Sequence, residues 1–105
     1  MAYQQILAAL ADPTRRGLFE RLRGGPLTVG ELARSARVTQ PAVSQHLRVL
    51  EKARLVRPPR REGTRRYYEA SADGLAELRR YLEAMWDDVL AAYAGEVRAP
   101  ERSTR

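Results

Sequence analysis

Two short helical patterns separated by only a tight turn constrain the fold of this 105-residue chain more than any other feature. The run Thr28-Val29-Gly30-Glu31 is a capping box, a threonine followed three residues later by a glutamate, and it opens a short helix. Thr39 can cap the next helix, in which Val43, Leu47 and Leu50 form an apolar stripe at i, i+4 and i+7. Two short helices joined in this way predict a helix-turn-helix.

Helical patterns also flank this pair on both sides. Residues 3–11 read as a first helix, and Asp12-Pro13 supplies an N-cap and a first-turn proline for a second helix over 13–23. Ser71 can cap a long last helix over 72–94, which we expect Gly95 to close. The chain is therefore predicted to be mostly helical.

The segment between the fourth and last helices predicts a small β-hairpin. Pro58-Pro59 forbids a helix there, and two extended runs, 56–61 and 64–69, flank a turn at Glu62-Gly63. The resulting order, α-α-α-α-β-β-α, is that of a winged helix-turn-helix in which the hairpin is the wing. We expect one domain over residues 1–97, for DNA binding and dimerisation, and a polar, disordered tail over 98–105.

Positive charge gathers around the predicted helix-turn-helix and wing. The chain has a net charge of +6, and residues 34–66 hold ten basic residues against two acidic ones, whereas residues 67–97 hold two against seven. This segregation favours double-stranded nucleic acid as the partner, the alternative being a basic surface that only aids solubility. The ten basic residues are Arg34, Arg37, Arg48, Lys52, Arg54, Arg57, Arg60, Arg61, Arg65 and Arg66.

The residue inventory excludes several classes of protein. The absence of cysteine removes disulfides, thiolate metal sites and cysteine nucleophiles, and the single histidine, His46, cannot form a multi-histidine metal site. No catalytic constellation and no glycine-rich phosphate loop is visible, so we expect no enzymatic activity, no cofactor and no bound metal. No run is long and apolar enough to span a membrane and no basic leader opens the chain, so a cytoplasmic protein without a membrane partner is expected.

The helix after Thr39 has the face of a recognition helix. At 100° per residue, its exposed side lies opposite the apolar stripe and carries short polar or cationic groups that suit the major groove. Glutamine can read adenine edges there and arginine can read guanine, although an ordinary solvated face would explain the polarity equally well. The candidate DNA-contacting residues on this helix are Thr39, Gln40, Pro41, Ser44, Gln45, Arg48 and Lys52. His46 falls closer to the core side.

The tip of the predicted wing carries the second group of candidates. Four arginines bracket the turn, where long side chains can reach phosphates or a narrow minor groove. A charged hairpin tip is usually only solvated, but here it follows a candidate recognition helix. These residues are Arg60, Arg61, Arg65 and Arg66.

The last helix carries more apolar surface than one small domain easily buries. One row follows 3-4-3-4 spacing, a second row adds Trp86, Leu90 and Tyr93, and two residues of the first helix can pack beside them. We interpret the surplus as a homodimer interface, the alternative being that both rows pack within one chain. The expected interface residues are Ile6, Leu10, Leu75, Leu78, Leu82, Met85, Trp86 and Val89.

Three stretches carry a resemblance to a known family: ALADPTRRGLFERL, LTVGELARSARVTQPAVSQHLRVLEKARLV and RREGTRRYYEAS. Over residues 4–93 the chain resembles the ArsR/SmtB family of bacterial winged-helix transcriptional repressors. The resemblance implies homodimers that form through the first and last helices and bind palindromic operators. It also implies DNA contacts by Val29, Gln40, Pro41, Ser44 and Gln45, with the wing at 60–66.

The chain departs from the metal-sensing members of that family. Their cysteine pair falls at Thr28 and Gly30, which supply no thiolate, and the last helix has no histidine, only Glu77, Glu83, Asp87 and Asp88. The chain therefore resembles the branch without a metal site, and no inducer is identified. We expect a homodimeric repressor. Two alternatives are an interaction module that has lost DNA binding and a repressor with a small-molecule site between the dimer's long helices.

Overall fold

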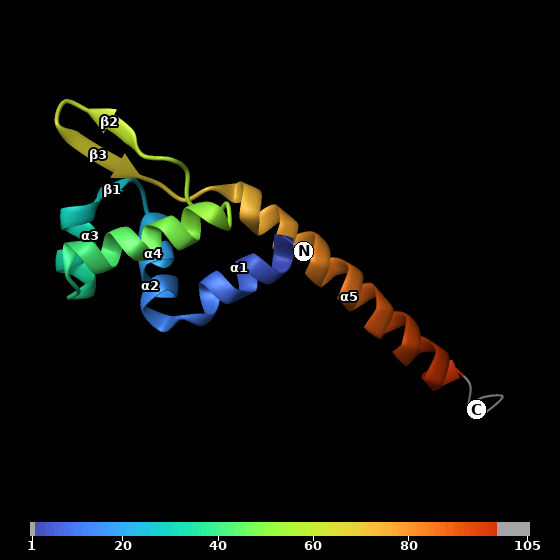
Figure 1. Ribbon diagram of the computed structural model, residues 1–105. Helices are drawn as coiled ribbons and strands as arrows, with labels where there is room; N and C mark the ends of the chain where they lie inside the picture. Colours follow the sequence, from blue (N-terminus) through green and yellow to red (C-terminus); the bar gives the residue numbers. More distant parts are fainter. Residues whose placement is uncertain (1, 99–105) are drawn as a thin grey trace.

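The computed structural model describes the backbone of residues 2–98 and the side chains of residues 3–94. Within that part of the chain, five helices and three short strands follow one another along the sequence (Figure 1). The helices are α1 (Ala2–Ala11), α2 (Pro13–Leu22), α3 (Val29–Ala36), α4 (Gln40–Lys52) and α5 (Ala72–Arg98). The strands are β1 (Leu27–Thr28), β2 (Arg60–Glu62) and β3 (Arg65–Tyr68). The expected winged helix-turn-helix is confirmed, with one strand more than predicted.

The helices begin where the sequence supplies a cap. The Asp12 carboxylate accepts a hydrogen bond of 2.8 Å from the backbone N–H of Arg15 and so opens α2. Both bonds of the capping box are present: Thr28 Oγ1 accepts from the Glu31 N–H at 3.1 Å, and Glu31 Oε1 accepts from the Thr28 N–H at 2.9 Å. The Thr39 hydroxyl caps α4 at 3.3 Å. These local bonds fix the boundaries of the helix-turn-helix.

The last helix is longer than predicted. Ser71 is the expected cap, since its hydroxyl accepts from the Asp73 N–H at 3.1 Å, but α5 runs through Gly95 to Arg98. A glycine costs a helix about 1 kcal/mol relative to alanine, and that cost alone does not end a helix. The prediction that Gly95 closes the helix is therefore wrong. Apart from Arg98, the predicted tail at 98–105 lies outside the described residues.

The hairpin joins a three-stranded antiparallel sheet in the order β1-β3-β2. The strands are shorter than expected because Pro58 and Pro59 interrupt the pairing after an isolated bridge between Val56 and Ala70. The turn is Gly63-Thr64, one residue later than predicted, and Gly63 has a positive φ of 63°. The strand β1, which the sequence did not reveal, pairs with β3 and attaches the wing to the start of α3.

The core lies between α1, α2, α3 and α4 and is closed by the chain that follows α4. Its largest fully buried side chains are Ile6, Leu18, Leu22, Leu32, Val43, Leu47, Leu50, Leu55 and Val56. The predicted stripe of α4 belongs to this set. The helix that carries the candidate recognition face is therefore anchored along its whole inner side.

Helix α5 leaves this body and extends away from it, so the molecule is 69 Å long and 23 Å wide (Figure 1). Its first half packs against α1, where the rings of Tyr3 and Tyr81 stack at 4.1 Å. Leu10 and Leu78 are partly buried against the core. Ile6, expected at a dimer interface, is only 1% exposed. That expectation is corrected, because the core of its own chain already covers Ile6.

Candidate nucleic-acid interface

The outer face of α4 is polar and open to solvent. Ser44 is half-buried on the flank of the helix, and the remaining candidates on this helix are exposed. The predicted orientation of α4 is therefore confirmed: its polar side chains lie on the side opposite the buried apolar stripe. The exposed candidates are Thr39, Gln40, Pro41, Gln45, Arg48 and Lys52.

An arginine that the sequence did not single out ties α4 to the first two helices. Arg15, at the start of α2, donates from Nε to the carbonyl oxygen of Ala9 at 2.6 Å and from Nη2 to that of Ala8 at 3.1 Å. Its Nη1 lies 3.4 Å from Nδ1 of His46, which is half-buried on α4. The last carbonyls of a helix lack intrahelical partners and attract cations. Arg15 therefore binds the end of α1 and holds α4 beside it.

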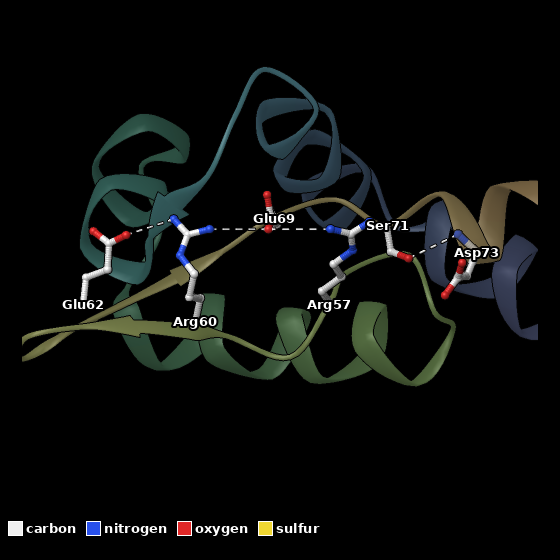
Figure 2. Close-up of polar contacts among 6 residues, drawn as sticks. All are labelled: Arg57, Arg60, Glu62, Glu69, Ser71 and Asp73. Carbon is white, nitrogen blue, oxygen red and sulfur yellow. Dashed lines mark hydrogen bonds and ion pairs between the residues drawn. The ribbon is translucent and has the colours of Figure 1, made fainter.

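The base of the wing is a small network of ion pairs (Figure 2). The Glu69 carboxylate lies 3.8 Å from the Arg57 guanidinium and 3.6 Å from that of Arg60, and Arg60 also lies 3.3 Å from Glu62. The Arg60 guanidinium lies 5.9 Å from the ring centre of Tyr67, within cation–π range. Arg60, a candidate DNA contact, is thus already engaged within the protein.

The other three wing arginines are exposed, and within the described residues none of them forms an ion pair. In the β2–β3 register Arg61 is directly opposite Arg66, and Arg65 is opposite Glu62. Two like charges at directly opposed positions destabilise a hairpin. An anion that bound this face would relieve the repulsion between Arg61 and Arg66.

Two further arginines stand at the ends of α4 in a backbone conformation that favours glycine. Arg37, in the turn between α3 and α4, has φ 60°, and Arg54, two residues after the end of α4, has φ 62°. Both side chains are exposed. The left-handed region costs a side-chain-bearing residue roughly 1–2 kcal/mol. Cations therefore occupy two positions where the backbone alone would select glycine, and both belong to the basic segment 34–66.

The start of α3 lies against the wing. Val29 is half-buried and packs against the core, while Thr28, Gly30 and the two β3 arginines line a recess with it. The pKa of the Glu31 carboxyl is lowered, chiefly because its carboxylate accepts the Thr28 N–H, and the charges of Arg34 and Arg65 lower it further. The recess itself is bordered by cations on the wing side.

Known proteins that resemble this chain have the same helix-turn-helix architecture. A family model described as a helix-turn-helix domain matches residues 10–59. The chain is 57% identical over 86 residues to the HTH-type transcriptional regulator Rv2034 of Mycobacterium tuberculosis, a match that covers 82% of this chain and 79% of that protein. An ArsR-like transcriptional regulator from Rhodococcus has a similar structure, with a TM-score of 0.74 at 30% identity over 88% of this chain and 89% of its own.

The chain belongs to the ArsR/SmtB family of winged-helix transcriptional regulators.

Two further relatives of this ArsR/SmtB-family protein have informative names. The transcriptional repressor SdpR of Bacillus subtilis is 32% identical over 72 residues, which cover 69% of this chain and 79% of the repressor. A homodimeric winged helix-turn-helix DNA-binding domain from Mycobacterium bovis is similar with a TM-score of 0.65 and 28% identity, over 83% of this chain and 80% of that domain.

Thr28, at one of the two positions where the resemblance places the cysteine pair of metal-sensing members, has a structural role in this ArsR/SmtB-family protein. Thr28 and Gly30 stand at those positions, and both Thr28 groups that could face a ligand, the hydroxyl and the N–H, are used in the capping box. The described residues contain no group of three histidine, cysteine, aspartate or glutamate side chains placed to bind a metal ion. In the same part of the chain, no helix combines the length and apolarity that a membrane span requires.

Proposed function

We propose that this regulator is a homodimeric repressor that binds a palindromic DNA operator, reading bases with α4 and holding phosphates with the wing. The observation that carries the proposal is the exposed polar face of α4 beside wing arginines that have no carboxylate partner among the described residues. An interaction module without DNA binding would have no need for Arg61 and Arg66 to face each other.

The reading function rests on residue chemistry and on rigidity. Gln40 and Gln45 can each pair with an adenine edge, and Arg48 can pair with guanine. Their backbone is anchored by the buried stripe of α4 and by the contact between Arg15 and His46. Residues in the first turn of a recognition helix approach the bases most closely, which favours Thr39, Gln40 and Pro41. Because the face is held before DNA arrives, little conformational entropy is lost on binding.

The phosphate function rests on charge. Residues 34–66 carry ten basic residues and only two acidic ones, Glu51 and Glu62. Each phosphate neutralised by arginine or lysine releases counterions, so affinity falls as salt rises. Arg61, Arg65 and Arg66 are proposed for this role, with Arg37 added because its exposed side chain lies in the turn between α3 and α4.

The dimer is proposed from the outer half of α5. Leu82 is 46% exposed, Trp86 62% and Val89 54%, and together with Met85 they line an apolar groove along the helix. Burial of apolar surface stabilises an assembly by roughly 25 cal/mol per Å², so covering this groove with a second copy of the chain would stabilise a dimer. The relation to a homodimeric domain from Mycobacterium bovis supports this occupant. Two-fold symmetry would then place two α4 helices about one DNA turn apart, roughly 34 Å.

Repression rather than activation is proposed from the names of relatives such as the Bacillus subtilis repressor. A regulator of this kind acts on DNA in the cytoplasm and needs no catalytic step. The proposal includes no metal and no cofactor.

Binding-site selection from a random duplex pool, followed by titration at about 150 mM salt, tests the proposal. We expect a palindromic consensus and an affinity at least a hundredfold above that for a scrambled duplex of equal length. The log–log salt slope should be about −0.9 per phosphate contact. Equal affinity for both duplexes, or binding of one chain per duplex, would overturn the proposal.

A further inference from the structure

The chain that leaves α4 is held by backbone bonds at each step. Arg54 takes the left-handed conformation with φ 62°, its N–H donates to Glu51 O at 2.9 Å, and the Leu55 N–H donates to Leu50 O at 2.9 Å. This bond pair is a Schellman motif, accompanied by the usual contact between two apolar residues, here Leu50 and Leu55, both fully buried. The end of the recognition helix is therefore a fixed structure.

The start of α5 folds back onto that fixed end. The Ser71 N–H donates to Leu55 O at 2.9 Å, and the Gly74 N–H donates to Arg54 O at 2.7 Å. A Cβ atom at Gly74 would lie 2.7 Å from the carbonyl oxygens of both Ala53 and Arg54. Both oxygens are backbone atoms, so they cannot rotate away as a side chain would. Only glycine lets the two helices approach to this distance.

A second contact fixes the direction of α5. Tyr81, about 10 Å along the helix from Gly74, stacks on Tyr3 of α1 with the ring planes 6° apart. Helix α1 is in turn bound to α2 and α4 through Arg15. The two points, Gly74 and Tyr81, together determine the angle between α5 and α4.

We propose that this junction sets the spacing between the two operator half-sites, and that Gly74 is its specificity-determining residue. The inference rests on the dimeric function proposed above. If the dimer forms along the outer half of α5, each α4 is placed relative to the two-fold axis by the angle at Gly74. A base pair more or less between the half-sites moves them by about 3.4 Å and rotates them by roughly 35°. A junction held by backbone bonds cannot follow such a change.

The added methyl group of Gly74→Ala would push α5 away from the carbonyls of Ala53 and Arg54, just beyond the end of α4, and tilt it about the Tyr3–Tyr81 contact. Gly17→Ala is the matched control, because the same change in α2 meets only the end of the exposed Arg21 side chain, at 3.0 Å, which can rotate where a backbone carbonyl cannot. The probes are the duplex recovered by selection and versions of it with one or two base pairs inserted or deleted at its centre. A duplex with a single half-site measures base reading apart from spacing.

For the wild type and Gly17→Ala we expect one optimal spacing and at least a tenfold loss of affinity at two inserted base pairs. For Gly74→Ala we expect the optimum to move, or the affinity for the original duplex to fall at least tenfold, with half-site affinity within twofold of the wild type. A folded, dimeric Gly74→Ala protein with the wild-type optimum and affinity would overturn the inference.

If circular dichroism shows that Gly74→Ala is unfolded, Tyr81→Ala and Tyr81→Phe decide instead. Loss of the stacked ring should broaden or shift the spacing optimum, and Phe should restore it because it keeps the ring. An unchanged optimum in Tyr81→Ala would equally overturn the inference. A wild type that is monomeric or binds no palindrome refutes the dimeric function itself, which is a different outcome from an unchanged optimum in the variants.

Discussion

Arginine side chains that look alike in the sequence differ sharply in what they do in the fold. Arg15 is a structural cation that satisfies the carbonyls of α1, and Arg60 is held by Glu62 and Glu69. Arg61 and Arg66 face each other without a carboxylate partner in the described residues. The charge pattern predicted a polyanion-binding segment, but only the packing separates structural arginines from those open to a ligand.

Substitution of a base-contacting residue and of a phosphate-contacting residue should change DNA binding in different ways. Gln45→Ala removes an exposed candidate base contact, so we expect a loss of about 1–3 kcal/mol per half-site and relaxed preference at the equivalent position of each half-site. Arg61→Ala removes an exposed wing cation from each chain of the dimer, so all duplexes should weaken alike and the magnitude of the salt slope should fall by about 1.8, which is about 0.9 for each of two lost phosphate contacts. Binding-site selection and salt titration of both variants make the comparison. Identical changes in the two variants would contradict the assigned roles.

Arg37, whose backbone lies in the left-handed region, gives a stability prediction for which Arg34 serves as a control. Arg37→Gly should raise the free energy of unfolding by about 1 kcal/mol, because φ 60° is strained for arginine and ordinary for glycine. Arg34→Gly, a change of the same kind three residues earlier within α3, should lower it by about 0.5–1 kcal/mol. Thermal unfolding of both variants measures the sign. A destabilised Arg37→Gly protein would show that the Arg37 side chain is needed for the fold.

At the level of elements, local chemistry predicted most boundaries and long-range pairing explains the differences. Caps and helical spacing depend on neighbours within four residues, so α2, α3 and α4 begin where Asp12, Thr28 and Thr39 predicted. The strand β1 exists only because Leu27 pairs with Tyr68, 41 residues later, and Thr28 pairs with Tyr67, 39 residues later. No local pattern in two residues reveals such a partner.

The candidate site was predictable to the same extent. The exposed face of α4 followed from helical phase, whereas the contact of Arg15 with His46 joins residues 31 positions apart. The role of Glu69 in binding Arg57 and Arg60 likewise depends on the sheet register. Ile6 was misassigned for a related reason: its helical spacing fits an interface and a core equally, and only the packing of α1 against the other helices decides between them.

The capping box should make stability depend on pH in the acid range. The lowered pKa of Glu31, caused first by the Thr28 N–H, means that the folded state prefers the carboxylate. This contribution is present above the carboxyl's ordinary pKa of about 4 and is lost as pH falls through the lowered folded value. We expect Glu31→Gln to be less stable than the wild type at pH 7, with a difference that shrinks on acidification. Denaturant midpoints across that range measure it, and a constant difference would contradict the cause.

At the level of the whole molecule, one helix accounts for the elongated shape. The outer half of α5 extends beyond the helical body (Figure 1), and its apolar side chains are exposed in the single chain. The ion pair between Arg79 and Glu83 borders the apolar groove, and the pair between Arg80 and Glu77 lies about one turn nearer the body. A helix of 27 residues with this surface is consistent with assembly of two chains.

Leu82→Glu tests that assembly. Because Leu82 is 46% exposed, a glutamate there should leave the fold of each chain intact. In the dimer, its carboxylate would be buried beside the same carboxylate of the second chain, and the two charges would repel each other. We expect a monomer at micromolar concentration and loss of tight operator binding, although no DNA-facing residue has changed. Ala84→Glu, an exposed position on the opposite side of the same turn, should remain dimeric. Sedimentation and gel-shift titration measure both, and a dimeric Leu82→Glu protein would exclude this interface.

Thr28 has a consequence for the time course of binding. Its backbone pairs with Tyr67 of the wing, while its hydroxyl and N–H close the first turn of α3. The wing and the helix-turn-helix thus share one residue and cannot move as separate arms. In the proposed complex, contacts to the minor groove and to the major groove must therefore form in a single encounter, so rapid mixing of protein and operator should give one exponential phase whose rate rises linearly with protein concentration.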